Sequence, residues 1–324
     1  MEFSVGVIGA GGMGSRHVRH WSRVPGVKVT AIADLFDLAK AEQLAASIEA
    51  QAFSSAETLL ASGCDVVSIC TPTDSHRILA EQALAAGCHV LCEKPMALTL
   101  EDCDAMVVAA EKAGKLLSVG QVVRFFPEYA NAKRMVDSGA VGKPAAVRAR
   151  RGGGFPGWSE WFADVNRTGG IIFDLAVHEF DWLLWCFGPV IRVYAKAITG
   201  RYEKCDLALI TLRHASGCVS HVEAIWADPQ GGGTRFEIAG DGGLLSHDAR
   251  LSSSLSYRTE THQGGTSPLH TDDDPYYKQC LAFARAVRGE APLVVTAKDG
   301  RAAIAVAAAA SESLKTGRAI SVEV

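Results

Sequence analysis

Near its start the chain reads Val5-Gly6-Val7-Ile8-Gly9-Ala10-Gly11-Gly12-Met13-Gly14, a strand of small and β-branched residues that runs into a glycine-rich turn. A helical pattern follows near Ser15–Arg23. In such a turn Gly9 allows the tight bend, Gly11 lets the backbone approach a ligand, and Gly14 lets the helix pack closely on the strand. The free N–H groups and the positive end of the helix attract an anion. The stretch Gly9–Gly14, with Gly12 and Met13, is therefore predicted to bind the pyrophosphate of a dinucleotide.

An acidic residue ends the second apolar strand. This strand, Val27–Ala33, is followed by Asp34, which lies about twenty residues after the last glycine, as in dinucleotide-binding units. A carboxylate there can accept hydrogen bonds from the adenosine ribose; the alternative is a solvated acid at a strand end. Because a carboxylate repels a 2′-phosphate and no Arg or Ser follows in Leu35-Phe36-Asp37, we expect NAD to be preferred over NADP.

Length, charge and cysteine content limit the class of protein. A chain of 324 residues is longer than a single hydrophobic core usually supports, so two domains are expected. The net charge of −4 and the absence of long Lys/Arg runs argue against a nucleic-acid or membrane partner. We expect neither a signal segment nor a membrane span. The nine cysteines show no C-x-x-C and no zinc-ligand spacing, so they are interpreted as free thiols of a cytoplasmic protein without a metal.

Strand and helix patterns alternate through the first third of the chain. Strands are expected at Val5–Ile8, Val27–Ala33, Ala50–Phe53, Asp65–Cys70, His89–Cys92 and Leu116–Gln121. Helices are expected at Ser15–Arg23, Asp37–Ser47, near Glu57, Ser75–Ala86 and Leu100–Ala113. Repeated β-α-β units with apolar strands indicate a doubly wound parallel sheet of Rossmann type within an α/β fold. We assign this domain to residues 1–122.

The pattern changes in residues 123–324, which we assign to a second, α+β domain with a largely antiparallel open sheet. Extended segments separated by turn residues are expected at Ala145–Arg151, Ile191–Thr199, Leu207–Arg213, Cys218–Ala227 and Arg235–Ala239. Helices are expected at Pro127–Ser138, Gly170–Phe187, Pro275–Arg288 and Lys298–Thr316. The polar segment Leu251–Pro268 is interpreted as a mobile loop.

Two turns at strand ends are candidates for the site, because ligands of parallel sheets bind beyond the carboxyl ends of the strands. In the first, Thr71, Pro72 and His76 would border the cofactor, with His76 in an orienting role; a proline turn with a helix cap is the structural alternative. In the second, Glu93-Lys94-Pro95, the Lys94 ammonium could bind a substrate hydroxyl and stabilise negative charge on its oxygen. An ordinary surface lysine is the alternative, and Pro95 permits a cis peptide.

A late helix carries an acid and a histidine at helical spacing. Asp174, His178 and Asp181 follow each other at i, i+4 and i+7, so regular helix geometry predicts that their side chains meet on one face. A carboxylate can orient a neighbouring imidazole and favour its protonation, which suits the imidazole for proton transfer. A purely structural His–Asp pair is the alternative.

Taken together, these segments resemble the Gfo/Idh/MocA oxidoreductase family, which includes inositol and sugar dehydrogenases. The resemblance covers the whole chain, with the Gly9–Gly14 turn, the Asp34 strand end, Thr71-Pro72 with His76, Glu93-Lys94-Pro95, and Asp174 with His178. It implies that Lys94, Asp174 and His178 form the catalytic group, and that the open sheet of the second domain mediates a homo-oligomer. Gln121 and Arg124 lie in Val119–Phe125, which matches a segment that borders cofactor and substrate in similar enzymes.

The expected reaction is the reversible oxidation of a secondary alcohol on a sugar or cyclitol. His178, oriented by Asp174, would remove the hydroxyl proton while Lys94 stabilises the alkoxide. Trp158, Trp161 and Asn166 are further candidates for substrate contacts, with core packing as the alternative for the two rings.

Two other functions remain open on the same fold. One is NAD-assisted glycoside cleavage, in which the bound cofactor oxidises and then re-reduces the same sugar. The other is a sensor that binds NAD without turnover, although a sensor needs no proton-transfer pair. The sequence does not define the sugar or cyclitol, nor does it separate a dimer from a tetramer.

Overall fold

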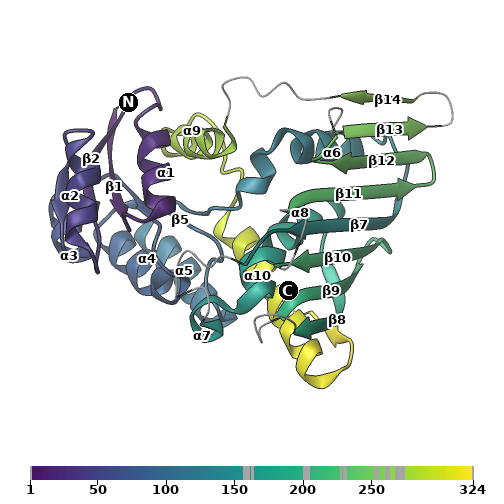
Figure 1. The fold of residues 1–324 in the computed structure, drawn as a ribbon. Coiled ribbons are helices and arrows are strands. Elements are labelled where there is room, and N and C mark those ends of the chain that lie inside the picture. The colour runs from purple at the N-terminus through teal and green to yellow at the C-terminus, as the bar shows by residue number, and fades with distance from the viewer. Residues whose placement is uncertain are drawn as a thin grey trace. The chain divides into compact units, whose positions relative to one another are not determined.

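The structure is a computed structural model that describes residues 2–155, 161, 164–199, 205–226, 228, 232–251, 255–259, 263–266 and 274–322. It divides into two compact units, each described here by itself (Figure 1). The first unit comprises Met1–Val122 and Asp272–Arg301, and the second comprises Val123–Thr271 and Ala302–Val324.

The first unit is built on a parallel sheet of six strands. These are β1 (Phe3–Ile8), β2 (Val27–Ala33), β3 (Gln51–Phe53), β4 (Val66–Ile69), β5 (His89–Cys92) and β6 (Leu117–Val119). Their order is β3-β2-β1-β4-β5-β6, and each neighbouring pair is parallel. This is the strand order of a dinucleotide-binding sheet, so the predicted doubly wound domain is confirmed.

Helices follow the strands of this sheet in sequence. They are α1 (Gly12–Trp21), α2 (Leu38–Ala46), α3 (Ala56–Ala61), the 3₁₀ turn η1 (Thr73–Ser75), α4 (His76–Ala85) and α5 (Leu100–Ala113). Alternate side chains of β1 point to opposite faces. Val5 and Val7 join the core formed with α1 and α2, whereas a Cβ at Gly6 would lie 2.8 Å from Leu59 of α3. The sheet is therefore covered on both faces.

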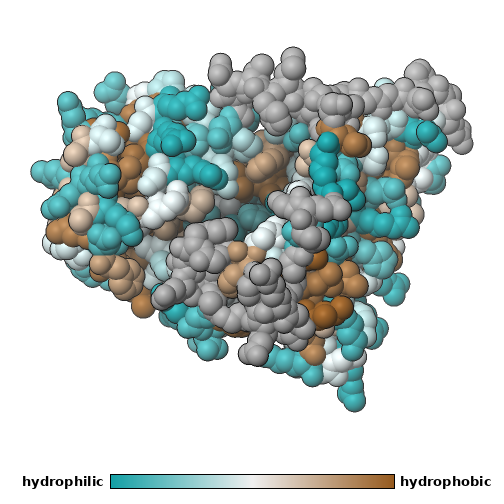
Figure 2. All heavy atoms as spheres, viewed as in Figure 1, coloured by the Kyte–Doolittle hydropathy of each residue, from teal (hydrophilic) through white to brown (hydrophobic). Residues whose placement is uncertain are grey.

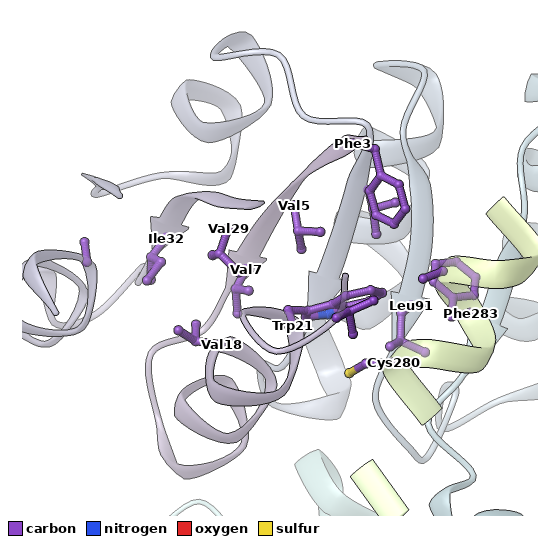
Figure 3. Close-up of a cluster of buried hydrophobic side chains, with 14 of the residues drawn as sticks. Phe3, Val5, Val7, Val18, Trp21, Val29, Ile32, Leu91, Cys280 and Phe283 are labelled. Atoms are coloured by element: carbon purple, nitrogen blue, oxygen red, sulfur yellow. The ribbon is translucent and has the colours of Figure 1, made fainter. Parts of the chain in front are cut away.

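A helix from late in the chain completes the core of the first unit. Figure 3 shows Cys280 and Phe283 of α9 (Pro275–Val287) beside Trp21 and Leu91. The rings of Trp21 and Phe283 meet edge to face, with centroids 6.4 Å apart. The sequence-based division placed all of residues 123–324 in the second domain, and the residues 272–301 are a correction to it. The apolar stripe of α9 was visible in the sequence, but nothing in the stripe indicates which sheet it covers.

The second unit contains a sheet of nine strands. These are β7 (Pro144–Gly152), β8 (Val190–Thr199), β9 (Cys205–His214), β10 (Val219–Ile225), β11 (Gly233–Gly240), β12 (Gly243–Asp248), β13 (Leu255–Thr259), β14 (Gln263–Thr266) and β15 (Ile320–Ser321). Their order is β14-β13-β12-β11-β7-β10-β9-β8-β15, and β7 and β10 pair in parallel while the other pairs of neighbours are antiparallel. The prediction of a largely antiparallel sheet is confirmed. The loop expected over Leu251–Pro268 is wrong where β13 and β14 extend this sheet.

One face of this sheet packs against helices. They are α6 (Pro127–Asp137), the π-helical turn η4 (Ile172–Ala176), α8 (Val177–Phe187) and α10 (Ala297–Thr316). The short helices η2 (Val122–Phe125) and α7 (Val165–Thr168) precede α6 and η4 in the sequence. An aromatic cluster fills the space between α6, α8 and β11. Tyr129 packs edge to face on Trp182 and Phe236, with centroids 5.0 and 5.1 Å apart. Such pairs add about 0.5–1.5 kcal/mol each beyond their buried area.

The surface of the described chain carries mixed side chains. Figure 2 shows hydrophilic residues over much of the visible face, with smaller hydrophobic patches between them. Among the described helices, none combines the length and the apolar character that crossing a membrane requires.

Candidate functional site

The glycine-rich turn between β1 and α1 is shaped by close backbone contacts. Gly9 has φ +100°, and a Cβ at this position would lie 2.6 Å from the carbonyl oxygen of Cys70. A Cβ at Gly14 would lie 1.7 Å from the carbonyl oxygen of Gly9. Only glycine satisfies both positions, so the sequence at these two residues sets the tight turn and the close packing of α1.

The same turn leaves space in front of the helix N-terminus. Added Cβ atoms at Gly11 and Gly12 would meet nothing within 4 Å. Gly11 is the N-cap of α1 and provides no side-chain cap, while Arg19 and His20 occupy the last turn. Because the first N–H groups of a helix need acceptors and its N-terminus is partly positive, an anion fits here. The turn, in which Met13 is partly exposed, fits the pyrophosphate of a dinucleotide.

The carboxylate of Asp34 is fixed beside this turn by three backbone N–H donors. Its Oδ2 accepts from Ala10 at 2.8 Å, and its Oδ1 accepts from Phe36 at 3.0 Å and from Asp37 at 2.9 Å. The next side chains offer no cation: Leu35 is apolar, and Phe36 is 83% exposed. The arrangement presents a rigid negative charge at the end of β2.

The turn after β4 is held mainly by its own hydrogen bonds. Thr71 Oγ1 and Ser75 Oγ are 2.7 Å apart, and Ser75 donates to the carbonyl of Pro72 at 2.7 Å. The buried His76 places Nδ1 at 2.9 Å from the Pro95 carbonyl and Nε2 at 2.9 Å from the Thr71 carbonyl. Burial lowers the pKa of His76, against the opposing effect of the two carbonyls. His76 thus links the segments that follow β4 and β5, and its orienting role stays a prediction.

Lys94 follows β5 and is partly exposed, whereas Glu93 before it is buried. The Lys94–Pro95 peptide is cis. Glu93 Oε2 accepts the Lys94 backbone N–H at 3.1 Å, and Oε1 lies 2.9 Å from His17 Nε2. Burial opposes ionisation of Glu93, but the hydrogen bond from His17, together with the charge of Lys94, outweighs it, so the pKa is lowered. Sequence reasoning missed His17, although its position three residues after Gly14 turns it toward the sheet.

Gln121 lies just beyond β6, and its side chain is buried. Neither atom of its amide group has a hydrogen-bond partner among the described residues. Buried amide groups are rarely left in this state, so a bound ligand that pairs with Gln121 fits this position. The first unit therefore gathers the predicted cofactor residues at the carboxyl ends of β1, β2, β4, β5 and β6.

The predicted acid and histidine lie in the second unit, on a helix that is not regular. Asp174 belongs to the π-helical turn η4, and His178 lies in the first turn of α8. Thr168 ends α7, and its Oγ1 accepts from the Gly170 N–H at 3.1 Å. The regular α-helix expected over Gly170–Phe187 is therefore corrected, and π-helical turns of this kind are frequent at functional sites. Asp174 and His178 both remain partly exposed.

The buried carboxylate of Asp181 forms a bidentate ion pair with an arginine. Arg124 Nε lies 2.8 Å from Oδ2 and Nη2 lies 2.6 Å from Oδ1, with side-chain exposures of 3% and 1%. The guanidinium also lies over the Trp185 ring, 5.3 Å from its centroid. The charge of Arg124 is thus paired with a carboxylate of α8, and a contact between Arg124 and substrate stays a prediction. The i+7 spacing could not reveal the partner, which comes from another helix.

A second buried ion pair holds the next carboxylate of α8. Glu179 Oε1 accepts from Arg151 Nε at 3.2 Å and from the Tyr129 hydroxyl at 3.1 Å, and Oε2 accepts from Arg151 Nη2 at 3.2 Å. Burial, reinforced by the charge of Glu179, raises the pKa of Tyr129, so this phenol stays protonated as a donor. The two residues that flank His178 at i+1 and i+3 are thus fixed to neighbouring elements.

The remaining candidates for substrate contacts lie before α8. Trp158 is outside the described residues. Trp161 is partly exposed, and its carbonyl accepts the Asp164 N–H at 3.1 Å. Asn166 is exposed on α7. These substrate contacts stay predictions.

Thiol and metal chemistry find little support in the described part of the chain. The eight described cysteines are free, and burial raises the pKa of Cys88 to about 11 and of Cys103 to about 12, which keeps these thiols protonated. No group of three or more His, Cys, Asp or Glu residues in the described ranges could hold a metal ion.

Comparisons with known proteins agree with the fold and the residue pattern. Residues 3–121 match the model of an oxidoreductase family with an NAD-binding Rossmann fold, GFO_IDH_MocA, and residues 129–246 match the GFO/IDH/MocA C-terminal domain. The chain is 29% identical to scyllo-inositol 2-dehydrogenase (NAD(+)) of Bacillus subtilis, over 98% of this chain and 96% of the relative. It is 34% identical to D-apiose dehydrogenase of Paraburkholderia graminis, over 81% and 70% of the two chains.

A solved structure gives the same result in three dimensions. A putative myo-inositol dehydrogenase of Sinorhizobium meliloti superimposes with a TM-score of 0.85 at 27% identity, over 99% of this chain and all of the other. The chain belongs to the Gfo/Idh/MocA family of NAD-binding oxidoreductases.

Proposed function

We propose that this protein oxidises a secondary alcohol of a sugar or cyclitol, reversibly and with NAD. The observation that carries the proposal is the combination of a dinucleotide turn, a lysine at the end of β5, and an acid and a histidine at the start of α8. Relatives named for inositol and for apiose support this substrate class without selecting one compound.

The residues of the first unit would hold the cofactor. The N–H groups at Gly11 and Gly12 suit the pyrophosphate, Asp34 suits the ribose, and the unpaired amide of Gln121 suits a polar group of the same ligand. When bound, NAD accepts the hydride from the alcohol carbon.

The protein's own groups handle the proton and the developing charge. His178 takes the hydroxyl proton, Asp174 orients the imidazole, and the Lys94 ammonium stabilises the oxygen while the carbonyl forms. The products are the ketone, NADH and one proton.

This function is tested by measuring NAD reduction with a panel of inositols, aldoses, sugar acids and amino sugars. We expect NADH to accumulate with at least one member of the panel. No reduction with any of them would overturn the proposal. Release of an aglycone from a glycoside without net NADH would instead identify a glycosidase.

Cofactor choice follows from the charge at the end of β2. The Asp34 carboxylate is fixed by three N–H groups and repels a 2′-phosphate, so we expect kcat/KM with NAD to exceed that with NADP by at least about tenfold. Asp34→Ser should narrow this ratio. Equal efficiency of the wild type with both cofactors would contradict this role of Asp34.

We further propose a cytoplasmic homo-oligomer that forms through the face of the nine-stranded sheet opposite α8. This face exposes apolar side chains, including Tyr194, Ile198 and Leu209, among arginine–carboxylate pairs such as Arg235 with Asp248. A pocket of about 600 Å³ opens on it and contains none of the residues assigned to the reaction. Light scattering should show a dimer or tetramer, whereas a monomer at micromolar concentration would contradict this.

A further inference from the structure

A hydrogen-bond chain of buried polar side chains in the first unit ends at Glu93, the residue before Lys94. The Trp21 indole Nε1–H donates to Ser68 Oγ at 2.8 Å, and Ser68 Oγ lies 3.2 Å from His17 Nδ1. His17 Nε2 lies 2.9 Å from Glu93 Oε1. His17 and Ser68 are fully buried, and Glu93 is 6% exposed. These groups therefore depend on one another, and not on water, for their hydrogen bonds.

One arrangement of hydrogens satisfies every member of this chain. An indole N–H can only donate, so Ser68 Oγ accepts from it and keeps its own O–H for a further partner. If Ser68 donates to His17 Nδ1, the proton of the neutral imidazole is on Nε2 and points to Glu93. The chain therefore runs in one direction, from Trp21 to the carboxylate, and neighbouring bonds strengthen one another.

The carboxylate at the end of this chain has no room to move. Its second oxygen accepts the Lys94 backbone N–H at 3.1 Å. On its other side, a Cβ at Gly120 would lie 3.0 Å from the carboxyl group, so the backbone of the segment after β6 is packed against it. The packing and the hydrogen bonds of Glu93 thus fix the position of the Lys94 backbone just after β5.

We propose that His17 is a positioning residue, which acts through Glu93 to hold Lys94 at the carboxyl end of β5. The inference rests on the proposed function, in which Lys94 binds the reacting hydroxyl. His17 is buried and bound to Ser68 and Glu93, and its influence on the reaction passes through the carboxylate.

The ionisation of Glu93 depends on the titratable and charged groups around it. Those that interact with it electrostatically are His17 of α1, Lys94, His76 of α4, the thiols of Cys70, Cys92 and Cys280, and the phenol of Tyr276 on α9. Among these, His17 and Lys94 favour the ionised carboxylate. Loss of the His17 hydrogen bond should therefore move the ionisation of Glu93 to higher pH.

Two substitutions of His17 separate a positioning role from simple packing. The amide nitrogen of His17→Gln can reach Glu93 in place of Nε2, whereas the shorter His17→Asn can reach only Ser68. We expect His17→Asn to lower kcat by roughly 10- to 100-fold with little change in KM, and to move the acid limb of the pH profile upward. We expect His17→Gln to stay within about threefold of wild type.

A matched control is present in the second unit. His214 is also fully buried, with Nε2 2.9 Å from Ser220 Oγ and Nδ1 2.9 Å from the Gly188 carbonyl. His214→Asn and His214→Gln remove a buried imidazole of the same kind without touching Glu93, and both should leave kcat unchanged. Equal losses of kcat in the His17 and His214 variants would show a general packing effect and would overturn the proposal.

A second readout does not depend on turnover. Infrared difference spectra, assigned with Glu93→Gln, report the ionisation of Glu93 in wild type, His17→Asn and the milder Ser68→Ala. The carboxyl signal should appear at higher pH in His17→Asn and, less so, in Ser68→Ala. No shift in either variant would overturn the inference. If wild type oxidises no member of the polyol panel, the proposed function fails, while this spectroscopic test of His17 still stands.

Discussion

The end of β5 in the first unit and the start of α8 in the second differ in the groups that hold their buried carboxylates. Each carries a partly exposed side chain to which we assign a role in the reaction, Lys94 or His178, next to buried carboxylates. In the first unit the partners of Glu93 are an imidazole and a backbone N–H. In the second unit guanidinium groups bind the carboxylates.

This difference between the partners of Glu93 and those of the α8 carboxylates indicates which part of the candidate site responds to pH. An arginine stays charged at all ordinary pH values, so its ion pair changes only when the carboxylate itself titrates. Burial opposes ionisation of Glu93, and its pKa is lowered mainly by the hydrogen bond from His17, so a change at His17 changes the ionisation of this carboxylate. We therefore expect the support of α8 to be insensitive to pH near neutrality, and the support of Lys94 to depend on the ionisation of Glu93.

The largest expected effect is the loss of the proton acceptor. His178→Ala should lower kcat by about 10²–10⁴-fold, because positioned proton transfer contributes that much in typical enzymes. The dissociation constant of NAD, measured by fluorescence titration, should hardly change. His221→Ala, at an exposed position of β10, is the control. Wild-type turnover of His178→Ala at its optimal pH would show that the role is misassigned.

The next effect concerns the support of α8. Asp181→Ala leaves the buried Arg124 guanidinium without its bidentate partner and should cost about 3–5 kcal/mol of the free energy of unfolding. Glu111→Ala removes the partner of Lys298, where the two side chains are 65% and 78% exposed, and should cost at most about 1 kcal/mol. Urea denaturation at pH 7.5 measures both. Similar small losses in the two variants would mean that the buried pair does not hold the helix.

The smallest effect is the response of stability to acid. Burial lowers the pKa of His76 in the first unit from its ordinary value of 6.5. Below that value the unfolded chain binds a proton that the folded chain excludes, so stability is full above pH 6.5 and falls as the pH drops toward the lowered folded value. The slope is about 1.4 kcal/mol per pH unit for each such proton.

Denaturation at pH 7.5 and pH 5.5 measures this response. Wild type should lose stability between the two, and His76→Gln should lose less, since its side chain does not titrate. The same measurements on Asp181→Ala give the free energy of unfolding that this variant loses relative to wild type. This loss should not depend on pH in this interval. An identical pH response of wild type and His76→Gln would contradict the assignment to His76.

Much of the fold follows from local patterns in the sequence. The strand Val27–Ala33 and the helix Leu100–Ala113 have the expected bounds, because apolar runs between turn residues define them. The strands β13 and β14 were missed, because they are polar and glycine-rich and pair at the edge of the sheet. The return of α9 to the first unit was missed for another reason: periodicity shows that a stripe is buried but not what covers it.

The candidate site divides in the same way. The structural roles of Gly9 and Gly14 could be predicted, because they depend on neighbours in the chain and on backbone conformation. The partners of Arg124 and Glu93 could not, since Asp181 and His17 are distant in sequence and charge alone does not select between candidates. The π-helical turn at Ile172–Ala176 could not be predicted either, because the spacing of side chains was interpreted with the geometry of a regular α-helix.

The central claim is that the Lys94 ammonium and the His178 imidazole, each held by its own unit, act on one hydroxyl of a polyol. A crystal structure of the complex with NADH and a bound inositol tests it most directly. We expect one substrate oxygen within about 3 Å of both Lys94 Nζ and a ring nitrogen of His178. An inositol bound elsewhere, or the two side chains pointing to opposite sides of the molecule, would contradict it.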